Sequence, residues 1–278
     1  MKTEVYFLNL DRVPDRAVFM TDQCAHGGIT APIRVSATDA SATRDYTSPR
    51  YRPHSWGPYW SMTKTEVAVF ESHRKTWETI VETDRPGAIF EDDILLSSTA
   101  GAVITALGSE QAQFDLVKLD AVGGRYRFGP MRVLGGQNLR RVVGVLPSAA
   151  AYLLSPSGAA QLLEQSQSYC DHLDDFITRP WPGFRAYQLD PAVAVQGMFS
   201  DLSNRVDIPA SVIGSERTDF GKAAPDDGRG PFTYRAMKEI KRTARKIDQK
   251  RGGDKRLLAS GGFIGEVPLS GDLPPFKR

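Results

Sequence analysis

A chain of 278 residues with 41% hydrophobic content is long enough for one large α/β domain and has the composition of a globular protein. Its formal net charge of +2 gives no general attraction to nucleic acid, which is therefore not an expected partner. Cys24 and Cys170 lie in unrelated contexts without zinc-site spacing, so we expect both to be reduced. No apolar segment has the length of a membrane span or a signal peptide, which predicts a cytoplasmic location.

The N-terminal region predicts two strands separated by polar segments. Four consecutive apolar residues at residues 5–8 are typical of a buried strand, which ends at Asn9 before a charged segment. A weaker strand is predicted at residues 33–35. Residues 38–61 are rich in Ser, Thr, Pro and aromatic residues without periodicity, so we expect a long surface loop there.

The clearest helix signal covers residues 63–83. Apolar side chains recur there at helical spacing, and Thr63 with Glu66 has the pattern of a capping box. After a break, residues 88–90 predict a short apolar strand that runs directly into three carboxylates at residues 91–93. The acidic triplet is therefore expected at the C-terminal end of a buried strand.

Strands and helices continue to alternate through the centre of the chain. The predicted elements are helices at residues 98–107 and 156–163, strands at residues 114–119, 141–145 and 149–154, and a Gly-rich turn region at residues 123–136. Ser155 before a proline is a good N-cap for the later helix. Alternation of this kind implies a largely parallel sheet, in which active sites lie beyond the C-terminal ends of the strands.

The acidic triplet Glu91, Asp92 and Asp93 is the first candidate for chemistry. Carboxylates packed together raise one another's proton affinity unless a cation neutralises them, and Mg²⁺ or Mn²⁺ binds a few carboxylates together with phosphate oxygens and water. In an extended segment Glu91 and Asp93 point to one side and Asp92 to the other. We predict that Asp93 binds the metal ion, which bridges a donor diphosphate, while Glu91 or Asp92 contacts the ribose. The alternative, which the triplet by itself favours, is a solvated acidic turn.

A mixed polar and apolar stripe follows the predicted helix at residues 63–83. Its members are Glu66, Phe70, His73 and Trp77, at spacings of three and four. Such a mixture suits a helix that lines a pocket. The alternative interprets Glu66 as a capping residue and His73 as a hydrogen-bonded core histidine, and it is favoured without further observations.

A second acidic cluster surrounds His172, with Asp171 before it and Asp174 and Asp175 after it. A general base that deprotonates an acceptor hydroxyl must come from a carboxylate or a histidine, and Asp174 is our candidate. The alternative, equally favoured locally, is the polar face of a short helix.

Taken in order, six segments resemble glycosyltransferase family 25, which includes bacterial lipooligosaccharide galactosyltransferases. The segments are FLNLDR at residues 7–12, the helix stripe at residues 66–77, IFEDDI at residues 89–94, AYLLS at residues 151–155, LDDF at residues 173–176, and YQL at residues 187–189 followed by Gln196. Each piece alone is weak, and their common order over residues 5–196 makes the resemblance specific.

The resemblance implies a fold and an activity. The fold is an α/β, GT-A-like, Rossmann-type mixed sheet flanked by helices, with a catalytic domain at residues 1–200 and a C-terminal extension at residues 201–278. The activity is inverting transfer of a hexose, with galactose favoured, from a UDP-sugar to a hydroxyl of a glycan or glycolipid in lipopolysaccharide biosynthesis, with Mn²⁺ or Mg²⁺ as cofactor.

The resemblance also implies roles for named residues. It places Asp93 at the metal ion, Glu91 and Asp92 near the donor, Asn9 and Arg12 near the nucleotide, and Asp174 as the base. We also predict that Glu66 and His73 bind the donor. Thr65 stands where the family usually has glycine, and this difference would change how the acceptor or the sugar fits.

Two other functions compete with glycosyl transfer. A sugar nucleotidyltransferase also uses metal-bound carboxylates on a similar sheet, but no Gly-rich phosphate loop with a lysine follows Leu8. A catalytically silent carbohydrate-binding relative is favoured if the base is absent.

The C-terminal part of the chain is basic. Residues 235–256 contain ten Lys or Arg against three Asp or Glu, and residues 232–247 have helical spacing, whereas residues 209–231 are loop-like. We predict an amphipathic helix that makes peripheral contact with an anionic membrane surface, on the inner face of the membrane. The alternative is a solvated and partly flexible extension.

Overall fold

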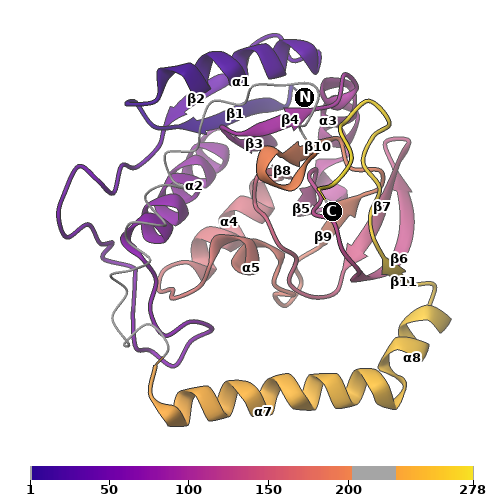
Figure 1. The fold of residues 1–278 in the computed structure, drawn as a ribbon. Helices are drawn as coiled ribbons and strands as arrows, with labels where there is room; N and C mark the ends of the chain where they lie inside the picture. The colour runs from indigo at the N-terminus through magenta and orange to yellow at the C-terminus, as the bar shows by residue number, and fades with distance from the viewer. Residues whose placement is uncertain (1, 202–229, 278) are drawn as a thin grey trace.

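A nine-stranded sheet forms the centre of the computed structural model, which describes residues 2–201 and 230–277 (Figure 1). The strands lie in the order β11-β6-β7-β9-β5-β8-β3-β1-β2. Their bounds are β1 Glu4–Asn9, β2 Ile33–Ser36, β3 Gly87–Glu91, β5 Leu116–Lys118, β6 Tyr126–Leu134, β7 Gln137–Val142, β8 Ala151–Leu154, β9 Ala186–Leu189 and β11 Phe263–Gly265. A separate two-stranded sheet pairs β4 Ile94–Leu96 with β10 Ala194–Gln196.

Helices cover both faces of this sheet. They are α1 Pro14–His26, α2 Lys64–Thr83, α3 Ala100–Gly108, α4 Pro156–Gln165, α5 Leu173–Thr178, α7 Phe232–Asp248 and α8 Asp254–Ala259, with the 3₁₀ turns Gln111–Gln113 and Gly197–Phe199 and the π-helical turn Gln249–Gly253. The alternating residues of β1 divide the core, because Val5 and Phe7 pack with α1 and α3 while Tyr6 and Leu8 pack with α2 and α4. None of the helices in the described ranges is long and apolar enough to cross a membrane.

The mixed sheet expected from the resemblance is confirmed, but the expectation of a largely parallel sheet is wrong. Of the eight pairings in the described nine-stranded sheet, three are parallel and five are antiparallel. β1, β2 and β3 are parallel because helices connect them, which supplies the long crossover that parallel strands need. Gly135 and Gly136, with φ of 54° and 74°, join β6 to β7 in a two-residue turn, and such a turn requires antiparallel strands.

The region at residues 123–136, predicted as turns, is mostly the strand β6. The pairing of β6 with β7 shifts register between Phe128 and Met131, where Pro130 cannot donate a hydrogen bond to the ladder. Gly129 and Pro130 therefore mark a bulge within a strand and not a turn. The strand predicted at residues 141–145 also begins earlier, as β7, because the turn lies immediately before it.

Other predicted elements are confirmed. The helices at residues 63–83 and 156–163 form as α2 and α4, and the helix at residues 232–247 forms as α7. Cys24 and Cys170 are both free and buried. The predicted loop at residues 209–231 lies outside the described residues except for its last two.

The C-terminal segment returns to the body of the protein. β11 pairs antiparallel with β6. The Ala192 backbone N–H donates to the Pro268 carbonyl at 2.9 Å, and the Lys277 N–H donates to the Phe199 carbonyl at 2.9 Å. The division into a catalytic domain at residues 1–200 and an extension stays a prediction.

The N-terminus of α2 depends on its capping box. The Thr63 Oγ1 accepts from the Glu66 N–H at 3.2 Å, and the Glu66 carboxylate accepts from the Thr63 N–H at 2.8 Å. We expect Thr63→Ala to lower the free energy of unfolding by about 1 kcal/mol, because it leaves a helix N–H without its acceptor. Urea denaturation measures this loss. Thr79→Ala, within the same helix, is the control, and an equal loss in that variant would contradict the capping role.

Candidate active site

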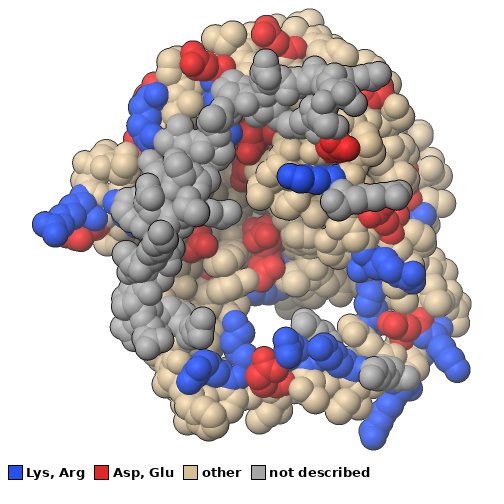
Figure 2. All heavy atoms as spheres, in the orientation of Figure 1, with Lys and Arg blue, Asp and Glu red and all other residues tan. Residues whose placement is uncertain are grey.

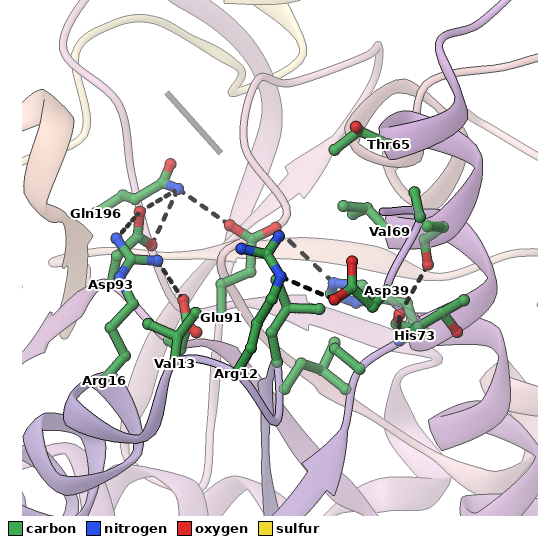
Figure 3. A pocket seen from close by; sticks show the side chains of 18 of the residues that line it. Arg12, Val13, Arg16, Asp39, Thr65, Val69, His73, Glu91, Asp93 and Gln196 are labelled. Carbon is green, nitrogen blue, oxygen red and sulfur yellow. Dashed lines mark hydrogen bonds and ion pairs between the residues drawn. The ribbon is translucent and has the colours of Figure 1, made fainter. Parts of the chain in front are cut away.

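The candidate site lies where β1 and β3 end side by side. The two strands are parallel with Leu8 opposite Glu91, so the residues that follow them, Asn9 and Asp92, also become neighbours. The acidic triplet therefore occupies the expected C-terminal strand end. A cavity of about 390 Å³ opens there, between α1, α2 and the loop after β2 (Figure 3). Its polar lining comprises Arg12, Arg16, Thr38, Asp39, Thr65, Ser72, His73, Glu91, Asp92, Asp93 and Gln196.

Asp92 is held by two side chains from the N-terminal part of the chain. The Arg16 guanidinium lies 2.5 Å from one carboxylate oxygen, and the Asn9 amide donates to the other at 2.9 Å. The Arg16 and Asp92 side chains are only 5% and 13% exposed. Asn9 is itself buried and does not line the cavity. Asn9 and Arg16 therefore both fix Asp92, and of the two only Arg16 also lines the cavity.

Glu91 and Asp93 share a partner on the other side of the segment, as the alternation of an extended chain predicts. The Gln196 Nε2 lies 3.0 Å from the Glu91 carboxylate and 3.1 Å from both Asp93 oxygens (Figure 3). The pairing of β10 with β4 brings Gln196 to this position, more than a hundred residues along the chain. Two carboxylates thus converge on one small region at the edge of the cavity.

Burial makes this pair of carboxylates costly to ionise. It raises the pKa of Glu91 to about 8, with further contributions from the charges of Asp93 and Asp92. Burial also raises the pKa of Asp93, although the Arg16 charge and the Gln196 hydrogen bond oppose it. A bound cation would favour the ionised form of both groups.

The donor set fits a divalent ion that takes most of its ligands from the substrate. Among the described residues, no group of three or more His, Cys, Asp or Glu has the arrangement of a preformed metal site. Mg²⁺ and related hard ions are commonly held by one or two carboxylates together with substrate phosphates and water. Asp93 and Glu91 would be the protein ligands of such an ion.

His73 lies in the wall of the cavity and is almost fully buried. Its Nδ1 is 2.8 Å from the Tyr152 hydroxyl, which accepts from the Trp77 indole N–H at 2.8 Å. If Tyr152 donates to Nδ1, the His73 proton resides on Nε2, which has no hydrogen-bond partner and lies 3.8 Å from the Glu91 carboxylate. Burial lowers the pKa of His73 to about 3, so the ring is neutral beside the acidic pair.

The remaining predicted donor residues separate into two groups. Arg12 lines the cavity and its Nε donates to Asp39 at 2.8 Å. Glu66 does not line the cavity: its carboxylate caps α2 and lies 3.4 Å from the His172 Nε2. The structure brings Arg12 and His73 to the site with the acidic triplet and leaves Glu66 at the end of the helix.

Asp174 lies in the first turn of α5, outside the lining of the cavity. Its carboxylate accepts from the Ser148 N–H at 3.3 Å and from the Asp175 N–H at 2.9 Å. The Asp174 charge contributes to the raised pKa of Glu91, so the predicted base and the acidic triplet share one electrostatic environment.

Sequence reasoning missed three residues of this region as site residues, Arg16, Gln196 and Asp120. Asp120 is fully buried, where it pairs with the Lys118 Nζ at 2.5 Å and accepts from the Ser148 hydroxyl at 2.5 Å. Its charge also raises the pKa of Glu91. The signal available for Asp120 was its position directly after a buried strand. Gln196 was already part of the sixth segment that resembles the family, but it was given no role.

The ion pair between Arg16 and Asp92 gives a stability prediction. We expect Arg16→Met to destabilise the fold by about 3 kcal/mol, because removing one partner leaves a mostly buried carboxylate without its cation. Adding Asp92→Asn should recover part of this loss. Urea denaturation of both variants measures the effect, and no recovery in the double variant would contradict it.

The mixed sheet flanked by helices, with carboxylates at the strand ends facing a deep cavity, defines the chain as an α/β enzyme. The model of the family "Glycosyltransferase family 25 (LPS biosynthesis protein)" matches residues 2–177, which is more than half of the chain. The chain therefore belongs to glycosyltransferase family 25, and is a glycosyltransferase of lipopolysaccharide biosynthesis with a sugar donor and an acceptor. A comparison with curated proteins finds no match.

Proposed function

We propose that the protein is an inverting, metal-dependent glycosyltransferase that moves a hexose, with galactose favoured, from a UDP-sugar to a hydroxyl of a glycan or glycolipid. The observation that carries this proposal is the pair Glu91 and Asp93, which converge on one amide beside the cavity and whose pKa values are raised by burial. Such a pair is suited to a divalent cation that also binds a diphosphate.

The shape and lining of the cavity support a nucleotide as its occupant. Its volume of about 390 Å³ lies within the range of ligand pockets. Apolar side chains form much of its wall, namely Leu8, Leu10, Val13, Ala37, Ala68 and Val69, and these suit a planar base. Arg12, which is paired with Asp39, adds a positive charge to the lining of the same cavity as the carboxylate pair.

In the proposed reaction, the acceptor hydroxyl gives its proton to the Asp174 carboxylate as its oxygen forms a bond to the anomeric carbon. The bond between that carbon and the diphosphate oxygen breaks, and its electron pair leaves with UDP. Because the acceptor oxygen enters opposite the leaving group, the configuration inverts. Asp93 and Glu91 would hold the metal ion, which would neutralise the negative charge on UDP. The Nε2 of the neutral His73 faces the Glu91 carboxylate from 3.8 Å without a hydrogen bond in the metal-free protein.

Calorimetry with UDP tests the donor site directly. We expect UDP to bind in the presence of Mn²⁺ and to bind at least about tenfold more weakly after chelation, because the diphosphate then faces two uncompensated carboxylates. Binding that is unaffected by chelation would contradict the metal assignment. A screen of UDP-sugars for Mn²⁺-dependent donor hydrolysis then identifies the sugar.

Two other functions compete with this proposal, and each is excluded in a different way. Membership of the family sets aside the nucleotidyltransferase alternative. A catalytically silent relative would bind UDP with Mn²⁺ yet release no UDP from any UDP-sugar, with or without an acceptor.

A further inference from the structure

The helix α7 has two chemically different sides. On a helix with 100° between successive residues, its apolar side chains fall on one side and its basic side chains on the other. The apolar side contains Phe232, Ala236, Met237, Ile240, Ala244 and Ile247. The basic side contains Arg235, Lys238, Lys241, Arg242 and Lys246.

The polar side of α7, not the apolar side, faces the protein. Tyr234 lies among the basic residues and is buried, with its hydroxyl 3.0 Å from the carbonyl oxygens of Gly57 and Pro58. Lys238, one turn further along, donates to the same Pro58 carbonyl at 2.9 Å. Figure 2 shows the basic side chains gathered along this helix, with open space between part of it and the body.

Most of the apolar side consequently faces solvent, although Ala236 and Met237 are half-buried and Met237 shares a groove with the loop at residues 56–58. Phe232 is 76% exposed, Ile240 is 69% exposed and Ile247 is 44% exposed. A helix at the surface of a globular protein ordinarily turns its apolar side to the core, so the inverted orientation of α7 leaves a row of large apolar side chains uncovered. From Phe232 to Ile247 this row extends over about 22 Å.

The orientation of α7 is fixed by an aromatic cluster in the loop before α2. The rings of Trp56 and Trp60 lie 5.9 Å and 5.2 Å from the ring of Tyr234. The Lys238 ammonium lies 5.0 Å from the ring of Tyr59. These contacts hold the helix by its polar side, and the apolar side is therefore presented without rearrangement.

We propose that the apolar side of α7 inserts into the surface of a lipid bilayer with anionic headgroups, and that the flanking Lys and Arg side chains bind those headgroups. A helix with a basic polar side, a separate apolar side and low overall hydrophobicity lies in the plane of such an interface. Each basic side chain near an anionic surface adds attraction. This inference goes beyond the proposed function, because it concerns where the enzyme works and not the reaction.

Charge favours a bilayer over a second copy of the chain. Two copies packed through the apolar sides of α7 would bring together the basic residues that border those sides, Arg235, Lys241 and Lys246, and such like charges repel. An anionic bilayer offers acyl chains to Phe232 and Ile240 and opposite charge to the residues beside them. For an enzyme whose acceptor is a glycolipid, the same contact would keep the active site close to its substrate.

Vesicle flotation of the full chain tests this proposal. The probes are vesicles of phosphatidylglycerol mixed with phosphatidylcholine, and vesicles of phosphatidylcholine alone. We expect binding to the anionic vesicles, at least tenfold weaker binding to the neutral ones, and strong weakening by 1 M salt, which shortens the screening length to about 3 Å.

The variant Phe232→Glu/Ile240→Glu should reduce binding to anionic vesicles at least tenfold. Both side chains are exposed, so folding should be unaffected, which circular dichroism verifies. The matched control is Val18→Glu, an exposed apolar position on α1, which should bind as the unaltered chain does.

Three outcomes would overturn the proposal: no binding of the unaltered chain to anionic vesicles, equal binding by the double variant, or dimers of the unaltered chain that the double variant converts to monomers. The flotation assay contains neither donor nor acceptor. Its failure therefore leaves the proposed function untouched, and loss of UDP-sugar hydrolysis in solution would leave this inference untouched.

Discussion

Asp93→Asn is expected to reduce glycosyl transfer at least about a hundredfold and to abolish the Mn²⁺ dependence of UDP binding. The substitution keeps the size and hydrogen-bonding shape of the side chain, and removes the negative charge that would bind the ion. Asp93 and Glu91 converge on Gln196, so the loss of one carboxylate leaves a single charged ligand from this pair. Calorimetry with UDP and Mn²⁺, together with a UDP-release assay, measures both effects.

The control for this prediction is Asp22→Asn, because Asp22 is an exposed acid on α1 that does not line the cavity. Thermal unfolding should show that both variants remain folded. Since burial raises the pKa of Asp93, its replacement by a neutral amide should not destabilise the metal-free protein. Mn²⁺-dependent UDP binding of normal strength in Asp93→Asn would remove Asp93 from the metal site.

Asp174→Asn is expected to lower the rate of transfer by a factor of about a hundred to ten thousand while UDP binding with Mn²⁺ remains normal. A base acts on the acceptor and not on the nucleotide, so the two measurements separate its role from donor binding. The amide keeps the acceptor oxygen for the Ser148 N–H, which preserves the local hydrogen bond. Initial rates over a series of acceptor concentrations show whether the loss lies in kcat.

The neighbouring Asp175→Asn is the matched control. Its carboxylate accepts from the Tyr59 hydroxyl at 2.8 Å, in the same acidic cluster and at similar exposure. A near-normal rate in Asp174→Asn would show that another group is the base.

Local features of the sequence determined the elements that carry the site. An apolar run predicted the strand that ends at Glu91, and capping residues predicted the start of α2. The alternation of side chains in an extended segment predicted that Glu91 and Asp93 share a side, and both contact Gln196, although Arg16 contacts both Asp92 and Asp93. These are short-range properties, because backbone periodicity and helix capping depend on residues only a few positions apart.

Only the tertiary structure decided how distant segments combine. The pairing of β10 with β4 placed Gln196 between Glu91 and Asp93, and α1 placed Arg16 against Asp92. Periodicity gave the two sides of α7 but not which one faces the protein, since that depends on the packing of Tyr234 against a loop far away in the sequence. Strand order, ion pairs and the orientation of a helix arise from contacts between remote residues, which no local pattern encodes.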